Sequence, residues 1–266
     1  MTDTNTQSMT HINTNVSDAS PSSSKRVLLS EQTMSSLFAN IAYVYQHHFL
    51  VILLCSALPM LPLFLIMELL KATGPIGQGL GLVPYMMGAF VVSGAMTIVL
   101  SDICLGNQPT VRRSYARILS GNLWWYIIST SLVYMLAVAL GMLLLLLPGL
   151  WLMVHGLFIA IIVALEGRCN RDAVRRSIAL TKGQAWRIIG LILPSTLLLM
   201  AFTIGLAIVA LKLPTMAASV VIILGNFVIL ATLSPVMQLT LVLLYYDQRV
   251  RRESYDAQAL SEDLMR

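Results

Sequence analysis

Charged side chains are few in this sequence, and the most informative ones lie in two short segments that follow long apolar runs. One segment, Leu243–Asp256, reads LLYYDQRVRRESYD, and the other, Ala164–Ser177, reads ALEGRCNRDAVRRS. The arginine guanidinium pairs with carboxylates and with phosphates through two parallel hydrogen bonds. These residue types therefore predict either ion pairs within the protein or a binding site for an anionic headgroup.

The candidate site consists of acidic and basic residues from both segments. They are Glu166, Arg175, Arg176, Asp247, Arg249, Arg251 and Arg252. In one interpretation, a carboxylate pairs with an arginine and locks an interfacial helix against the last membrane span. In another, the arginines attract an anionic lipid headgroup at the membrane boundary. The plainest interpretation of Leu243–Asp256 is a helix exit in which Tyr245 and Tyr246 join the interfacial aromatic belt.

Catalytic chemistry has little support in the residue patterns. The histidines, His11, His47, His48 and His155, show no zinc-ligand spacing, and the sequence contains neither a Gly-x-Ser-x-Gly elbow nor a phosphate-binding loop. The three cysteines include no Cys-x-x-Cys pair, which argues against a metal centre. We therefore expect a protein that is not an enzyme and that has no catalytic residue, metal or cofactor.

His155 is the one ionisable residue that we expect deep within a membrane span. Polar groups at that depth are costly and often mark a substrate or ion pathway. The structural alternative is a neutral imidazole that is hydrogen-bonded to a neighbouring helix.

The elements that must position these residues are membrane helices. The 266 residues are 57% hydrophobic and 11% charged, whereas soluble domains carry about 25% charged residues. A helix of about 20 apolar residues crosses the hydrocarbon. The uncharged runs predict six spans, Phe49–Leu70, Val83–Leu105, Leu123–Leu147, Leu150–Leu165, Ile188–Leu211 and Ser219–Tyr246. The segment Pro148–Leu150 is expected to turn the chain between the third and fourth spans, and Pro235 to kink the last one unless that helix tilts.

The orientation follows from positive charges in short loops, which prefer the cytoplasm. With the N-terminus inside, every Lys and Arg except Lys71 and Lys212 falls on the cytoplasmic side. We therefore expect a multi-pass protein of a bacterial-type inner (plasma) membrane, with both termini cytoplasmic. Residues 1–30 are expected to be a disordered cytoplasmic tail, 31–256 the integral membrane domain and 257–266 a cytoplasmic C-terminal tail.

A weak repeat precedes each pair of spans. TVRRSYARILSGNLWWYIIS from Thr110 and AVRRSIALTKGQAWRIIGLI from Ala173 share Val-Arg-Arg-Ser and a later tryptophan, and TMSSLFANIAYVYQHHFLVI from Thr33 aligns with the first without a gap. The predicted fold is therefore all-α: a polytopic membrane protein with about six transmembrane helices in three hairpins, each preceded by a cytoplasmic amphipathic helix.

The third amphipathic helix has the clearest pattern. Its apolar face is expected to comprise Ala173, Ile178, Leu180 and Trp186, which alternate with basic residues at helical spacing. Asn170 or Asp172 is expected to cap its start. Such a helix lies in the membrane interface.

A family resemblance is carried by Leu144–Leu193, which contains a Pro-Gly turn, a span ending in Leu-Glu-Gly and a helix reading Ala-x-Arg-Arg-Ser-x-x-Leu-Thr-x-Gly. This segment resembles the membrane domain of some bacterial glycerophosphodiester phosphodiesterases, and the ending Tyr-Tyr-Asp-x-Arg-x-Arg-Arg-Glu of the last span fits the same family. YciC-like integral inner-membrane proteins are similar more distantly. Cys169, Gln248 and Ser254 depart from the family pattern. In that family the catalysis resides in a separate soluble domain, so the resemblance implies a membrane domain and no activity.

The expected function is that of a non-enzymatic scaffold or accessory subunit, which engages a membrane-protein partner or anionic lipid headgroups at its cytoplasmic face. The alternative is a small transporter or lipid-handling permease that uses the span interior near His155. A water-accessible cavity reaching His155 would favour transport, whereas a packed interior with an exposed basic surface would favour the scaffold. The net charge of +5 is accounted for by the cytoplasmic arginines, so nucleic acid is not an expected partner.

Overall fold

The described part of the chain is built from helices. The computed structural model describes residues 33–253 and 257–265, so the expected tail 1–30 lies outside the described residues. Within the described part, six helical segments are long and apolar enough to cross a membrane. The predicted class, a polytopic all-α membrane protein, is confirmed.

The helices follow one another in three units. The first consists of α2 (Met34–His47), α3 (Phe49–Lys71) and α4 (Pro75–Leu105). The second consists of α5 (Val111–Leu119), α6 (Leu123–Leu144), α7 (Leu146–His155) and α8 (Ile159–Glu166). The third consists of α9 (Asn170–Thr181), α10 (Ala185–Ala210), α11 (Thr215–Thr232) and α12 (Ser234–Glu253), and α13 (Ala257–Met265) follows it.

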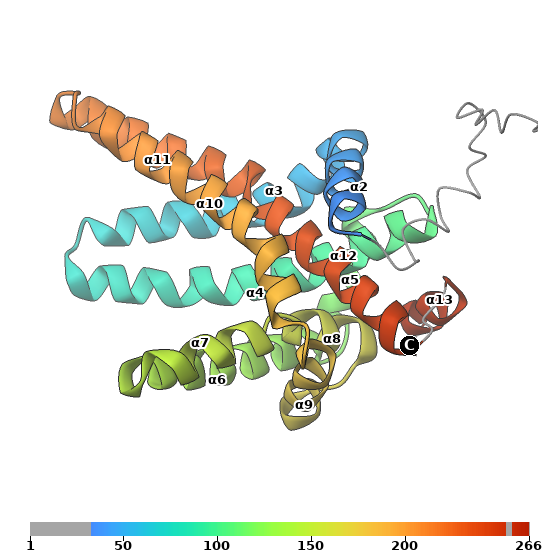
Figure 1. The fold of residues 1–266 in the computed structure, drawn as a ribbon. Coiled ribbons are helices and arrows are strands. Elements are labelled where there is room, and N and C mark those ends of the chain that lie inside the picture. The colour runs from blue at the N-terminus through green and yellow to red at the C-terminus, as the bar shows by residue number, and fades with distance from the viewer. Residues whose placement is uncertain (1–32, 254–256, 266) are drawn as a thin grey trace, which may run out of the picture.

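Three helical hairpins, α3–α4, α6–α7 and α10–α11, extend toward the left in Figure 1 and spread apart at their turns. We call the side with these turns, at residues 72–74, 145 and 211–214, the hairpin end. The opposite side holds α2, α5, α8, α9, α13 and the second half of α12, and we call it the capped end. The capped end is the one that the distribution of Lys and Arg predicts to be cytoplasmic.

The three amphipathic helices α2, α5 and α9 bury the same positions of the repeat. The buried residues are Leu37, Ser114 and Ser177 at the first position, and Ile41, Ile118 and Thr181 four residues later. A spacing of four residues places each pair on one stripe of its helix. Gly121 and Gly183 also occupy equivalent sites after α5 and α9, with φ of 76° and 78°. The repeat in the sequence is therefore a repeat of local structure.

Two details of α9 differ from the prediction. The N-cap residue is Cys169 and no side chain caps the helix, so neither Asn170 nor Asp172 has the expected role. Asn170 is instead the first helical residue, with a positive φ of 53°. Trp186 lies in the first turn of α10 and is 86% exposed, because the chain turns at Gly183 before reaching it.

The turn between α6 and α7 lies before the predicted turn at Pro148–Leu150. Leu145 alone separates the two helices, with an extended backbone of φ −153° and ψ 124°. Pro148 lies in the first turn of α7, where its missing N–H leaves no helical hydrogen bond unmade. Gly149 permits a close helix approach, since an added Cβ would lie 2.4 Å from the backbone nitrogen of Met142. The glycine therefore serves packing, and the predicted turn is wrong by a few residues.

The fourth and sixth spans are each interrupted. Residues 156–158 divide the fourth span into α7 and α8, and residue 233 divides the sixth into α11 and α12. As one straight helix, the 39 residues of Thr215–Glu253 would extend about 58 Å, roughly twice the thickness of the hydrocarbon. The second half of this segment accordingly belongs to the capped end.

The break beside Pro235 exposes backbone carbonyl groups, and side chains of the first unit satisfy them. Proline has no N–H, so the carbonyl oxygen of Ala231 lacks its helical donor. Ser56 Oγ donates to this oxygen at 3.3 Å, and Tyr45 Oη donates to the next carbonyl, that of Thr232, at 2.7 Å. Such compensation is required where a helix is interrupted at membrane depth.

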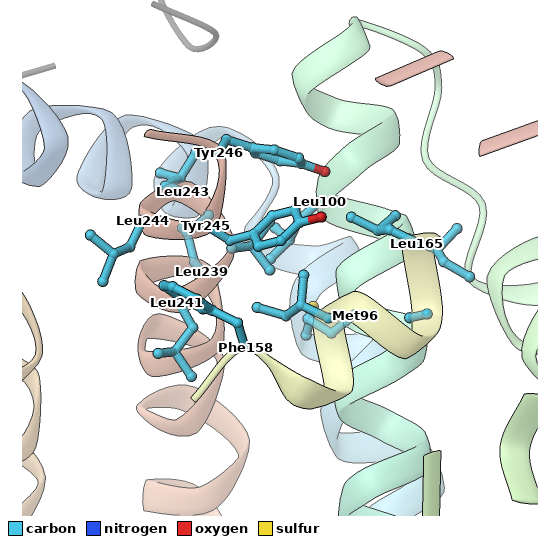
Figure 2. Packing of buried hydrophobic residues seen from close by; sticks show 14 of the residues in the cluster. Met96, Leu100, Phe158, Leu165, Leu239, Leu241, Leu243, Leu244, Tyr245 and Tyr246 are labelled. Atoms are coloured by element: carbon cyan, nitrogen blue, oxygen red, sulfur yellow. The ribbon is translucent and has the colours of Figure 1, made fainter. Parts of the chain in front are cut away.

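Packing is densest at the capped end. Tyr245 and Tyr246 of α12 are fully buried, and Figure 2 shows their rings beside Leu100 and reaching toward Leu165. Tyr246 Oη lies 2.5 Å from Ser101 Oγ of α4. The interpretation of these tyrosines as an interfacial aromatic belt is therefore wrong, because other helices enclose this part of α12. In contrast, none of the residues in the most apolar part of α10 is buried, as expected for a helix that faces lipid.

The segment 257–266, expected as a C-terminal tail, contains α13. The Leu260 side chain is fully buried, and α13 packs against α4 and α8. Arg117 of α5 donates from Nη2 to the carbonyl oxygen of Asp263 at 3.0 Å and also donates to the carbonyl of Leu264. The chain beyond the last span is thus part of the capped end.

Candidate functional site

Glu166 is the centre of the charged cluster at the capped end. It is the last residue of α8, and Gly167 ends that helix with a φ of 64°. The carboxylate is only 5% exposed. It accepts hydrogen bonds from Arg176 Nε at 3.1 Å to each oxygen and from Tyr245 Oη at 2.8 Å. A buried carboxylate needs such partners, because desolvation of an unpaired charge is costly.

Arg176 joins three helices through one side chain. While its Nε binds Glu166 of α8, its two Nη atoms bind the carboxylate of Glu253 in α12, with an Nη2–Oε2 distance of 2.6 Å. Burial opposes the charged form, but the hydrogen bonds and negative charges of both carboxylates outweigh it and raise the pKa of Arg176. The guanidinium therefore acts as a permanent cationic link between α8, α9 and α12.

Arg249 extends the cluster to α13. Its Nη1 lies 2.6 Å from Asp263 Oδ2 and 3.2 Å from Tyr245 Oη, and its Nε lies 3.1 Å from Glu253 Oε2. The guanidinium also lies over the Tyr245 ring at 5.7 Å from the centroid. These contacts explain why the segment after the last span docks as a helix.

Asp247 forms a second cluster on the other side of α12. Its carboxylate is 1% exposed and pairs with Arg187 of α10 at 2.9 Å and with Arg251 at 3.0 Å. Arg252, near the end of α12, donates to the carbonyl oxygen of Lys182 in the α9–α10 loop. Through its ion pair with Arg187, Asp247 fixes the start of α10 against α12.

The structure separates the predicted site residues into three groups. Glu166, Arg176 and Arg249 share one cluster, Asp247 and Arg251 belong to the second, and Arg252 binds backbone. Arg175 belongs to neither cluster. The reason is helical geometry: residues four apart share a face of α12, whereas residues two apart point to nearly opposite faces.

Five residues of the clusters were not among the sequence candidates. They are Arg168, Arg187, Tyr245, Glu253 and Asp263. The spacing of Tyr245, Arg249 and Glu253 at four-residue intervals is a signal that identifies one of the two faces. No signal in the sequence identifies Asp263, because its contribution depends on the docking of α13.

Arg175 and Arg171 line a pocket between α6 and α9. The pocket has a volume of about 380 Å³ and is lined on the α6 side by Thr130, Val133, Tyr134 and Ala137. Both arginines are exposed, and neither makes an ion pair or hydrogen bond with a described residue. The backbone N–H of Asn170 donates to Thr130 Oγ1 at 3.1 Å, and this hydrogen bond holds α6 and α9 together at the pocket. Two available guanidinium groups therefore adjoin an apolar helix face.

His155 is buried at the end of α7, with 6% exposure. Its Nδ1 lies 2.8 Å from the carbonyl oxygen of Trp151, and its ring stacks on the Trp151 indole at 4.1 Å. Its backbone carbonyl accepts a hydrogen bond from Ser177 Oγ of α9 at 2.5 Å. His155 does not line the pocket of Arg171 and Arg175, and its partners are those of a structural residue.

Gln248 is the one described residue with buried side-chain atoms that lack hydrogen-bond partners. The residue is 0% exposed, and neither Oε1 nor Nε2 has a partner. An unpaired buried amide lowers stability relative to a hydrocarbon of the same shape.

The described residues bring no group of three or more His, Cys, Asp or Glu side chains together in a metal-binding arrangement. The chemistry that the capped end offers is electrostatic: two internal ion-pair clusters and, at the pocket between α6 and α9, two exposed arginines with no described partner.

No protein-family model matches the chain, and no match to it was found among curated proteins or solved structures. The class that the structure supports is therefore that of a polytopic helical membrane protein with six spans. The resemblance to the phosphodiesterase membrane domain rests on the sequence motifs alone.

Substitution of Glu166 by glutamine is expected to lower the free energy of unfolding by about 3 kcal/mol, because it removes the charge that Arg176 faces in a buried site. The matched control is Glu68→Gln, which removes the carboxylate of the exposed pair with Lys71 and should change stability by less than about 1 kcal/mol. Thermal unfolding in detergent measures both. Similar melting temperatures for the two variants would show that Glu166 does not organise the capped end.

Substitution of Gln248 by methionine is expected to stabilise the protein by about 1 kcal/mol, since it removes unpaired polar atoms and keeps a similar shape. Gln46→Met in α2 is the control, because Gln46 is exposed and its replacement should change stability by less than about 0.5 kcal/mol. The same unfolding assay applies. A loss of stability in Gln248→Met would mean that the amide has a partner in the membrane.

Proposed function

We propose that this chain is a non-enzymatic scaffold of a bacterial-type inner membrane, which binds anionic phospholipid headgroups at its capped end, on the cytoplasmic side. The observation that carries the proposal is the pocket between α6 and α9, where Arg171 and Arg175 are exposed and free of described partners. Of the other candidate arginines, Arg176, Arg249 and Arg251 are neutralised by carboxylates within the protein, and Arg252 donates to the backbone carbonyl of Lys182.

The chemistry of the pocket suits a phospholipid. Each guanidinium can donate two parallel hydrogen bonds to phosphate oxygens. The α6 side supplies Val133, Tyr134 and Ala137, against which an acyl chain can lie. Amphipathic helices such as α9 lie at the depth of the headgroups, and basic residues at the cytoplasmic boundary attract anionic lipids.

The ion-pair clusters give the scaffold its rigidity in this proposal. Arg176 is the neighbour of Arg175 in α9 and is held by Glu166 and Glu253. This anchor fixes the orientation of α9, and the adjacent Arg175 therefore lies at the pocket beside α6. A preorganised pair of donors binds a headgroup with less loss of conformational entropy than two free side chains.

The alternative, transport through the span interior at His155, has less support. The imidazole binds its own helix and stacks on Trp151, and the His155 backbone anchors α9. A proton or ion pathway would need a chain of polar groups at this histidine. A membrane-protein partner at the cytoplasmic face remains the other ligand class of the scaffold proposal.

Replacement of both Arg171 and Arg175 by glutamine is expected to weaken phosphatidylglycerol retention by at least about tenfold, since charge-assisted hydrogen bonds contribute about 1.5–3 kcal/mol each. The control is Arg112→Gln with Arg113→Gln, the exposed arginine pair of the Val-Arg-Arg-Ser motif in α5, which removes the same net charge. Native mass spectrometry from nanodiscs with equal phosphatidylglycerol and phosphatidylcholine measures retention. Equal losses in both double variants would indicate a general charge effect and contradict the pocket.

The orientation is tested with the native thiol Cys169, which lies between α8 and α9 and is partly exposed, whereas Cys55 and Cys104 are buried. A membrane-impermeant maleimide is expected to label Cys169 in inverted membrane vesicles and not in intact spheroplasts. Cys169→Ser supplies the background. Labelling in spheroplasts alone would place the capped end outside and overturn the cytoplasmic part of the proposal.

A further inference from the structure

Two cavities, both partly open to the outside, adjoin one another between the hairpins. The larger, of about 420 Å³, lies among α4, α6, α7, α8 and α12, and the smaller, of about 140 Å³, lies among α3, α4, α11 and α12. Ala89, Ser93 and Gln238 line both cavities. Ser93 Oγ of α4 donates to Gln238 Oε1 of α12 at 3.2 Å, so one polar pair stands between the two spaces.

The cavities coincide with both interruptions of the spans. Gly156, Leu157 and Ile159, at the break between α7 and α8, line the larger cavity. Ser234 and Pro235, at the break between α11 and α12, line the smaller one. Interrupted helices at membrane depth occur where the backbone is buried in protein or lines a cavity, and in transporters they mark the binding site.

The polar groups of the cavities are neutral. The larger cavity contains Ser131 and Tyr134 besides the shared pair, and the smaller contains Ser56, Tyr85 and Ser234. Neither cavity is lined by Asp, Glu, Lys, Arg or His among the described residues. A charged group would be costly there, because nothing would neutralise it.

Gln238 is the residue best placed to recognise a ligand. Its Oε1 accepts from Ser93, while its Nε2 makes no hydrogen bond with a described residue. An amide nitrogen carries two donor hydrogens, and an acceptor oxygen in the cavity would satisfy them. Other polar groups of the cavities already donate to backbone carbonyls. Tyr134 Oη donates to the carbonyl of Leu152 at 2.7 Å, and Ser56 Oγ donates to that of Ala231 at 3.3 Å.

We propose that these adjoining cavities bind a neutral amphiphile of the diacylglycerol type, with one uncharged hydroxyl or ester group at Gln238 and Ser93. Its acyl chain lies against Phe90 of α4 and against Met135 and Val138 of α6, which line the larger cavity. The volume of the larger cavity, about 420 Å³, falls within the range of small-molecule sites. Predominantly apolar walls with a few convergent polar groups are also typical of such sites. The inference does not rest on the headgroup site at Arg171 and Arg175, which lies between α6 and α9 and takes the opposite class of lipid, an anionic one.

The test uses a diacylglycerol with a photoactivatable acyl chain, added to the full chain in phosphatidylcholine nanodiscs. Labelled peptides are mapped by mass spectrometry and are expected to derive from the cavity-lining parts of α4, α6, α7 or α8. Unlabelled diacylglycerol is expected to compete, whereas phosphatidic acid with the same acyl chains competes at least about tenfold more weakly. Equal competition by phosphatidic acid, or labelling spread over the lipid-facing surface of α10, overturns the proposal without any variant.

Gln238→Leu is expected to reduce specific labelling by about fivefold or more. The variant removes one hydrogen bond to the lipid and leaves the acceptor oxygen of the lipid desolvated without a donor. Ser131→Ala, a smaller change in the same cavity, should reduce it by a lesser factor. Thr203→Val in α10 is the control, because Thr203 Oγ1 donates only to its own helix, to the Leu199 carbonyl at 2.9 Å. Labelling of folded Gln238→Leu at the level of Thr203→Val overturns the assignment, and the phosphatidylglycerol assay of the Arg171 site should be unaffected by Gln238→Leu.

Discussion

The charge of Glu166, buried at the end of α8, is the constraint on which the capped end depends. A carboxylate in that position requires donors from several directions, and α9 and α12 provide them through Arg176 and Tyr245. Arg249 then carries the cluster on to α13. Buried ion pairs add little net stability compared with apolar packing, but removal of one member is strongly destabilising. Their consequence here is a defined arrangement of helices.

A second constraint comes from the membrane itself, since backbone groups exposed by an interrupted helix must find partners within the protein. Pro235 opens such a break, and Ser56 and Tyr45 satisfy the carbonyl groups that it frees. The break between α7 and α8 likewise brings the His155 carbonyl to Ser177. Hydroxyl groups of the first and third units thus compensate for the interruptions, and those of Tyr45 and Ser177 bind the hairpins to the amphipathic helices α2 and α9.

These two constraints divide the molecule. The capped end is packed around α12 and held by ion pairs, whereas the hairpins diverge and leave apolar surfaces for lipid and the cavities beside Gln238. The same division distributes the arginines, because those inside the clusters are neutralised and Arg171 and Arg175 are left at the α6–α9 pocket. The two proposed lipid sites therefore have different surroundings: exposed arginines beside the ion-pair clusters at one, and neutral cavity walls between the hairpins at the other.

The sequence by itself determined the class of protein, the approximate spans and the three repeated units, because apolar length and helical periodicity are local properties of the chain. It also singled out Glu166, Arg176 and Arg249, since charges beside apolar runs are conspicuous. Only the tertiary structure decided which charges meet. Residues such as Arg187 and Asp263 join the clusters through contacts between helices far apart in the chain, and Tyr245 is buried although its sequence position predicts the interface. The cavities at Ser93 and Gln238 depend on the contact of α4 with α12. The two residues are 145 positions apart in the chain, and no local sequence pattern predicts that they meet.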